Sequence, residues 1–251
     1  MSFPADFSGQ TVVVTGGTRG LGRAISLAFL AAGAEVRAVY KENDAAAAAL
    51  ADAASPHGAE RLTLDKVDVT DAVAVEAYWG ELERRSPRGV QVLVNNAGIR
   101  RDQLLAMMKL EDWSAVLAAN LTSGFLMSRQ AVLNMLPKRY GRILFITSPA
   151  AQHGFEGQAN YAASKAGQVG MMRSLAREVA RKGITVNCIS PGFVETELLA
   201  GLSAEALEKH KASVPMRRFG RPEEIAWAVT ALAAREATYV TGATLEVAGG
   251  L

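Results

Sequence analysis

The chain contains a single cysteine, Cys188, among 251 residues, so an intrachain disulfide is excluded. Cys188 falls in an apolar strand pattern, which favours a small buried hydrophobe over a nucleophile. The three histidines, His57, His153 and His210, are scattered without metal-ligand spacing, so we expect no metal site. These features are typical of a protein of the reducing cytoplasm.

Long apolar runs and a strong charge of either sign are also missing. No stretch of about 18 apolar residues occurs, so we expect no membrane span. Residues 1–6 lack a basic start followed by an apolar run, so we expect no signal peptide. A net charge of +2 is too small to indicate a nucleic-acid surface. With 49% hydrophobic residues, the chain is long enough for one large core, and we expect a single domain over residues 1–251.

Short β-branched runs alternate with helical patterns along the whole chain. This alternation predicts an α/β fold: a Rossmann-like, doubly wound, mostly parallel seven-stranded sheet with helices on both faces. The long connection at 193–216 has a size that often marks an active-site lid. The expected strands are 11–15, 35–40, 61–69, 90–94, 142–147, 184–190 and 244–247. The expected helices run from the glycine-rich turn to 32, then over 45–54, 71–85, 111–136 and 158–182, with a last one starting at 221–223.

Several motifs follow directly after predicted strands. They are the glycine-rich turn at 16–22, Asp68, the Asn95-Asn96-Ala97-Gly98 segment, Ser148 and Pro191-Gly192. The carboxyl ends of parallel strands meet at one edge of a sheet, where ligands of this fold class bind. The sequence therefore predicts one ligand site at that edge.

The glycine-rich turn Gly16-Gly17-Thr18-Arg19-Gly20-Leu21-Gly22 lies between the first strand and the first helix. This arrangement presents backbone N–H groups and the positive end of a helix dipole to a phosphate. Its spacing is G-x-x-x-G-x-G, and the alternative interpretation is a tight connection with no ligand. The second strand ends at Tyr40 and Lys41, with no acid before Glu42, and Arg19 lies in the turn. Two cations near a ribose favour a 2′-phosphate, hence NADP(H) over NAD.

Tyr161 and Lys165 stand four residues apart in a helical pattern, so they share one helix face. A neighbouring ammonium favours a phenolate and lowers the pKa of the phenol, which suits general acid–base catalysis. The alternative is a solvated surface pair, which is the usual meaning of an isolated Y-x-x-x-K. Asn120 lies in the middle of the helix predicted at 111–136, so we expect it to be either exposed or hydrogen-bonded.

These motifs together resemble the short-chain dehydrogenase/reductase family, in its order and approximate spacing over essentially the whole chain. The resemblance implies a catalytic group of Asn120, Ser148, Tyr161 and Lys165. It implies that Tyr161 donates a proton to a carbonyl oxygen, that Ser148 hydrogen-bonds this oxygen, and that Lys165 binds the nicotinamide ribose. Asn120 would hold a water that connects Lys165 to solvent. The expected cofactor-binding residues are Gly16, Thr18, Arg19, Gly20, Leu21, Gly22, Lys41, Asp68, Val69, Asn95, Ala97, Gly98, Tyr161, Lys165, Pro191, Gly192, Val194 and Thr196.

Further segments are similar to the bacterial β-ketoacyl-acyl-carrier-protein reductases of this family. They are residues 95–102, 140–143, 157–161, 174–178, 183–187 and the Gly249-Gly250 ending. The resemblance implies NADPH-dependent reduction of a β-ketoacyl thioester on an acyl carrier protein, by a homotetramer. It also implies a basic patch near the entrance that contacts the carrier, with Arg139 and Lys182 at the matching positions. Ordinary solvated side chains are the alternative for both.

Residues 149–156 depart from the pattern of those reductases, with Pro149 and Phe155 expected to stiffen and reshape the acyl pocket. His153 in this segment is a pocket candidate or a loop histidine. The departure leaves open a secondary-metabolite reductase or another carbonyl reductase or alcohol dehydrogenase. A non-catalytic NADP-binding protein fits less well, because a binder needs no proton relay. A serine hydrolase fits least, because Ser148 lacks a G-x-S-x-G elbow.

Overall fold

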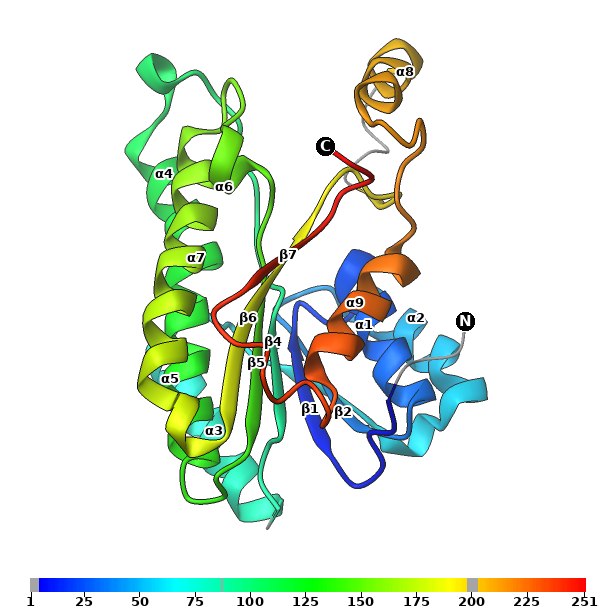
Figure 1. The fold of residues 1–251 in the computed structure, drawn as a ribbon, viewed down its shortest axis with the longest axis vertical. Coiled ribbons are helices and arrows are strands. Elements are labelled where there is room, and N and C mark those ends of the chain that lie inside the picture. The colour runs from blue at the N-terminus through cyan, green and yellow to red at the C-terminus, as the bar shows by residue number, and fades with distance from the viewer. Residues whose placement is uncertain (1–4, 87, 198–202) are drawn as a thin grey trace.

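The computed structural model describes residues 5–86, 88–197 and 203–251. At its centre lies a seven-stranded sheet with the order β3-β2-β1-β4-β5-β6-β7, and every pairing in it is parallel (Figure 1). The predicted mostly parallel sheet is confirmed. The strands are β1 (Thr11–Thr15), β2 (Glu35–Tyr40), β3 (Leu62–Lys66), β4 (Val92–Asn95), β5 (Gly141–Ile146), β6 (Ile184–Pro191) and β7 (Thr244–Val247).

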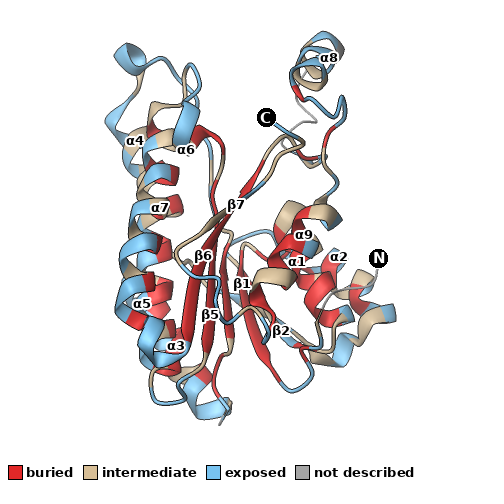
Figure 2. Cartoon of the chain, viewed as in Figure 1, coloured by how far each residue is buried: buried red, intermediate tan, exposed pale blue. Residues whose placement is uncertain are grey.

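The four central strands are buried on both faces, as Figure 2 shows for β1, β5 and β6. Continuous apolar runs such as Thr11–Thr15 suit this position, because a strand covered on both faces has no solvent side to alternate with. Two apolar cores result. One packs the sheet against α1 (Gly20–Ala31), α2 (Asp44–Ala54) and α9 (Pro222–Ala233). The other packs it against α3 (Ala72–Arg85), α5 (Ser123–Met135) and α7 (Ala159–Val179).

The prediction of one continuous helix over 111–136 is wrong. The structure divides it into α4 (Leu110–Leu117), a π-helical turn η4 (Ala118–Thr122) and α5. A π turn adds one residue to the helical ladder and is frequent at functional sites, because it redirects side chains and frees backbone groups. Here it surrounds Asn120.

Smaller differences concern element ends. The third strand is shorter than predicted, since β3 ends at Lys66 and Asp68 follows it in a loop. A short helix α6 (Ala150–His153), which was not predicted, lies within residues 149–156, the segment that departs from the pattern of the β-ketoacyl reductases. The 193–216 connection contains α8 (Ala204–Ser213), while residues 198–202 of the predicted lid lie outside the described part of the chain. Among the described residues, no helix is both long and apolar enough to cross a membrane.

Candidate functional site

Side-chain hydrogen bonds of Thr15 and Asn96 join the carboxyl ends of β1 and β4. The Thr15 hydroxyl accepts hydrogen bonds from the backbone N–H groups of Asn96 and Ala97, both at 3.0 Å. Asn96 donates back through Nδ2 to the carbonyl oxygens of Thr15 (2.9 Å) and Gly16 (3.1 Å). The predicted convergence of the glycine-rich turn and the 95–98 segment is therefore real.

The glycines of the turn allow α1 to approach this edge. A Cβ on Gly22 would lie 2.0 Å from the carbonyl oxygen of Gly16, and one on Gly20 would meet nothing within 4 Å. Gly16 and Gly20 have φ of 62° and 51°, the left-handed region that glycine adopts without strain. The two glycines therefore have different roles in the G-x-x-x-G-x-G turn. Gly22 allows close packing against Gly16, and Gly20 leaves the surface of the turn open.

The first turn of α1 has the character of an anion site. Its N-cap residue Arg19 makes no side-chain capping hydrogen bond, and the turn contains no acidic side chain. The first backbone N–H groups of α1 therefore have no side-chain acceptor from the cap residue or from an acid of the first turn. The helix dipole also favours negative charge at this end of the helix. The Arg19 side chain is 60% exposed and lies 3.8 Å from Glu197. These features fit a cofactor phosphate.

At the end of β2, Lys41 has an acidic partner that the sequence analysis did not foresee. Its ammonium lies 3.0 Å from Asp68 and 3.5 Å from Glu42. Hydrogen bonding to Asp68 raises the pKa of Lys41, so the side chain is a cation at neutral pH. Two residues expected to contact the cofactor separately, Lys41 and Asp68, are therefore neighbours, and their charges partly offset each other.

Tyr161 and Lys165 share one face of α7 as predicted, with the Lys165 ammonium 5.5 Å from the centre of the Tyr161 ring. Lys165 is buried, and its Nζ donates to the Ile146 carbonyl oxygen at 2.7 Å. Burial lowers the pKa of Lys165 to about 8. The predicted lowering of the Tyr161 pKa is wrong for the protein alone: burial raises this pKa, and the hydrogen bond to Ser148 offsets it only in part. Desolvation of the phenolate therefore outweighs the attraction to nearby cations.

Ser148 follows β5 and reaches the same edge. Its hydroxyl accepts from the backbone N–H of Ala150 at 3.2 Å, and it lies near enough to the Tyr161 phenol to lower the pKa of that group. Pro149, the N-cap residue of α6, is buried, whereas Phe155 is 47% exposed. The structure thus places a hydroxyl, a phenol and an ammonium together, which is a combination suited to proton transfer.

Asn120 is buried and fully hydrogen-bonded, which confirms one of the two predicted possibilities. Its Oδ1 accepts from the Ile99 N–H at 2.8 Å, and its Nδ2 donates to the Ile99 carbonyl oxygen (3.1 Å) and to Ser164 Oγ (3.0 Å). Its own carbonyl oxygen, in the π turn, accepts from Gln168 Nε2 at 2.6 Å. A Cβ on Gly98 would lie 3.0 Å from Asn120 Oδ1 and 3.8 Å from Lys165 Nζ, so Gly98 joins these two residues in space.

The other predicted cofactor residues divide into two groups. Pro191 ends β6, and Gly192 and Val194 follow it at the same edge. A Cβ on Gly192 would lie 2.8 Å from the Ala248 backbone. The Asn95 side chain instead turns into the core and donates to Ser128 Oγ at 3.0 Å. Thr18 and Val194 are buried, while Leu21, Val69 and Thr196 are half-buried.

Sequence reasoning missed the residues that hold the catalytic group in place. Asn160 is buried and donates through Nδ2 to the Arg101 carbonyl oxygen at 2.9 Å. Ser164 donates to the Tyr161 carbonyl oxygen at 2.7 Å and accepts from Asn120. Their only signal in the sequence is position, because both flank Tyr161 in the helix and show no chemical pattern of their own.

Arg139 and Lys182 do not lie near the entrance of this chain's site, contrary to expectation. Arg139 precedes β5 and Lys182 precedes β6, so both stand at the amino edge of the sheet. Tyr161 lies near the start of α7, at the carboxyl edge, and Lys182 lies beyond the other end of this helix (Figure 1). At a rise of about 1.5 Å per residue, the 21 residues of α7 separate them by about 30 Å.

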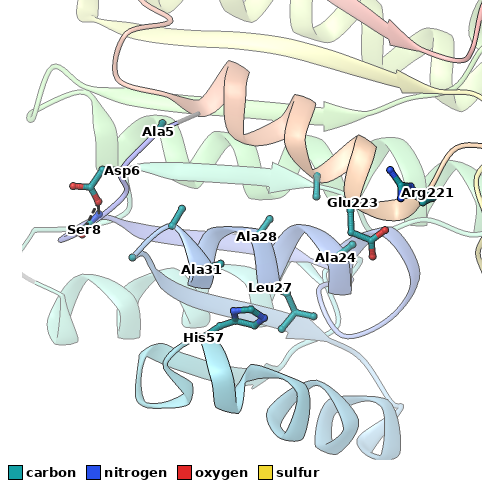
Figure 3. Close-up of a pocket in the computed structure, with 13 residues that line it drawn as sticks. Ala5, Asp6, Ser8, Ala24, Leu27, Ala28, Ala31, His57, Arg221 and Glu223 are labelled. Carbon is teal, nitrogen blue, oxygen red and sulfur yellow. Dashed lines mark hydrogen bonds between the residues drawn. The ribbon is translucent and has the colours of Figure 1, made fainter. Parts of the chain in front are cut away.

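An open groove of about 1100 Å³ lies elsewhere, over α1 and α9 (Figure 3). Small side chains such as Ala24, Ala28 and Ala31 line it, with His57 and Arg221 at its sides. None of the predicted site residues lines this groove. The candidate site is therefore defined by its side chains at the sheet edge, and the groove is a separate surface feature.

Comparisons with known proteins agree with this arrangement. Residues 16–251 match the family model described as enoyl-(acyl carrier protein) reductase. The chain is 43% identical to 3-oxoacyl-[acyl-carrier-protein] reductase FabG of Escherichia coli over 246 residues, 98% of each chain. It is 39% identical to FabG of Aquifex aeolicus over 248 residues, 97% of each. A crystal structure of a putative gluconate dehydrogenase from Agrobacterium tumefaciens superposes with a TM-score of 0.93 at 32% identity, covering 98% of this chain and 96% of that one. The chain belongs to the short-chain dehydrogenase/reductase family.

Proposed function

We propose that the protein reduces a 3-oxoacyl thioester on an acyl carrier protein to the 3-hydroxyacyl form, with NADPH, in fatty acid or polyketide-type biosynthesis. The observation that carries this proposal is the joint placement of Asn120, Ser148, Tyr161 and Lys165 beside the glycine-rich turn, in a chain whose curated relatives are named for this reaction. The catalytic group supplies proton chemistry, and the turn supplies a phosphate site.

A bound nicotinamide cofactor would supply the hydride for the carbonyl carbon, and the protein supplies the proton and the geometry. Tyr161 donates its phenolic proton to the carbonyl oxygen. Ser148 hydrogen-bonds the same oxygen and stabilises the negative charge that develops there. Lys165, held by the Ile146 carbonyl oxygen, positions the nicotinamide ribose and keeps positive charge near the phenol. Asn120 holds the 98–99 backbone and Ser164 beside them.

The cofactor site has features that favour NADP(H) over NAD. The first turn of α1 would hold the diphosphate, because it has neither a side-chain cap nor an acid of its own. Arg19 and Lys41, which are 60% and 58% exposed, would contact a 2′-phosphate. The two acidic neighbours of Lys41, Asp68 and Glu42, do not cancel this preference, because Arg19 supplies a second cation.

The decisive assay compares substrates under one set of conditions. Acetoacetyl thioester with NADPH should be turned over, and NADH should support a lower kcat/KM. Two alternatives come from the comparisons, namely an enoyl thioester, after the family model's description, and a sugar acid, after the solved structure. Turnover of either alternative without reduction of the 3-oxoacyl substrate would reject the proposal.

The protein's proposed assembly is a homotetramer. Large apolar side chains are exposed on α5, where Phe125 is 50% and Leu133 is 56% exposed, and at the sheet edge near β7, where Tyr239 and Leu245 are exposed. Exposed apolar side chains on two separate faces suit two kinds of subunit contact. Sedimentation equilibrium would test the stoichiometry.

A carrier protein bound at Arg139 and Lys182 would serve the active site of a neighbouring copy, because the site of the same chain lies about 30 Å away by helix length. Charge reversal at both positions should raise the KM for carrier-linked substrate and leave the KM for a small acyl thioester unchanged. Equal effects on both substrates would reject this docking role.

We further propose that the 193–216 connection acts as the substrate lid of a single catalytic domain. Its start is held by two contacts: Val194 forms a β-bridge with Gly220, which lies just beyond the connection, and the Phe193 and His210 ring centroids are 4.5 Å apart. In Figure 1, α8 extends above the carboxyl edge of the sheet. Slower hydrogen exchange in α8 on addition of NADPH would support the lid. The buried, free Cys188 also suits the proposed cytoplasmic location.

A further inference from the structure

The loop after β4 brings a second cation to the Tyr161 ring. The Arg100 guanidinium carbon lies 5.8 Å from the ring centre, close to the 5.5 Å of the Lys165 ammonium. Unlike buried Lys165, the Arg100 side chain is 35% exposed. It therefore stands on the solvent side of the site, within the distance at which a cation interacts with an aromatic face.

Arg100 is held in this position by a network that spans two loops. Asp102 accepts from Arg100 through both carboxylate oxygens, with the Nε–Oδ1 contact at 3.3 Å. Gln158, the N-cap residue of α7, donates to the same carboxylate at 3.2 Å. Close by, the Gln103 N–H donates to the Gly157 carbonyl oxygen at 2.8 Å. The network ends three residues before Tyr161, so it fixes the guanidinium relative to the phenol.

We propose that Arg100, clamped by Asp102, is a positioning residue that holds positive charge against the Tyr161 ring during the reduction step. This inference rests on the proposed role of Tyr161 as the proton donor. Within residues 5–86, 88–197 and 203–251, the charged groups that face the phenol are Arg100 and Asp102 from the loop after β4 and Lys165 from α7. The neutral thiol of Cys188 lies near Lys165. The cations Arg100 and Lys165 attract the phenolate, and the Asp102 carboxylate opposes it.

The opposite signs of Arg100 and Asp102 give a test that a purely structural role would not pass. Arg100→Gln should raise the pKa of Tyr161, and Asp102→Asn, which keeps the shape of the clamp, should lower it. For Arg100→Gln, Coulomb's law between charges about 6 Å apart gives a change of roughly half to two pH units, from the dielectric of water to that near a protein surface. Asp102→Asn should give a change of the opposite sign. The matched controls are Arg101→Gln and Asp112→Asn, which remove the same charges from a neighbouring ion pair at 3.6 Å.

Two readouts separate this inference from the proposed function. The first is NMR titration of protein labelled at the tyrosine ring carbon that carries the hydroxyl, with the Tyr161 signal identified among the five tyrosines by Tyr161→Phe. It needs no substrate. The second is the pH at which kcat/KM for reduction falls, which should move up for Arg100→Gln and down for Asp102→Asn.

Opposite shifts in both readouts, with unmoved controls, would support the proposal. Equal shifts in the control variants, or no shift in the titration, would overturn it. Full turnover by Tyr161→Phe would instead overturn the proposed proton donor, whatever the titration shows.

Discussion

Buried Lys165 should make the protein less stable at neutral pH than a chain without this charge. Its pKa falls from 10.5 to about 8 because burial penalises the ammonium. At about 1.4 kcal/mol per pKa unit, the ammonium costs the folded state about 3 kcal/mol wherever both folded and unfolded chains are protonated, that is, below about pH 8. Between about pH 8 and 10.5 the unfolded chain binds more protons than the folded one, so this cost disappears as the pH rises.

Lys165→Met tests this reasoning, because methionine is apolar and similarly shaped. The free energy of unfolding of the variant minus that of the wild type should decrease by about 3 kcal/mol between pH 7 and pH 10.5. At any one pH, this difference in the free energy of unfolding will be smaller than the desolvation cost alone. The reason is that the variant loses the hydrogen bond to the Ile146 carbonyl oxygen and leaves that oxygen without the lysine as a partner. The slope with pH is therefore the diagnostic quantity.

The assay is urea denaturation followed by circular dichroism at several pH values, for wild type, Lys165→Met and an exposed control, Lys209→Met. The ammonium of Lys209 stays in water in both states, so burial gives its removal no comparable effect. A difference between Lys165→Met and wild type that does not change with pH would refute the argument. Lys165→Met should also lose reductase activity, which would make Lys165 a residue retained for function at the expense of stability.

Three further predictions follow from single contacts. Tyr161→Phe should lower kcat for reduction by at least about 100-fold, the usual size of a general-acid contribution, and leave NADPH affinity nearly intact; comparable turnover would contradict the assigned role. Gly22→Ala should weaken NADPH binding and destabilise the fold by roughly 1–3 kcal/mol, because its Cβ would clash with the Gly16 carbonyl oxygen. The control Gly170→Ala, which has open space at its Cβ, should be neutral or stabilising in thermal denaturation. Lys41→Asp should shift the ratio of kcat/KM values toward NADH, and an unchanged ratio would argue against a role for Lys41 in cofactor choice.

Much of the fold could be predicted because it depends on local patterns. The β-branched runs at 11–15 and 184–190 fall within the observed strands, and the alternation with helices implies parallel strands without further information. The site's location followed from the same argument, because the carboxyl ends of parallel strands share one edge. The π turn around Asn120 was missed, because α- and π-helical turns have nearly the same hydrophobic pattern.

The sequence alone thus determined the fold class, the edge that carries the site, and the pairing of Tyr161 with Lys165 on one helix face. These features depend on the repeat of strands and helices, which is a property of neighbouring residues. Only the tertiary structure decided the electrostatics: that burial dominates the pKa of Tyr161, and that Lys41 faces Asp68. Burial and through-space distance involve residues far apart in the chain, so no local pattern contains them.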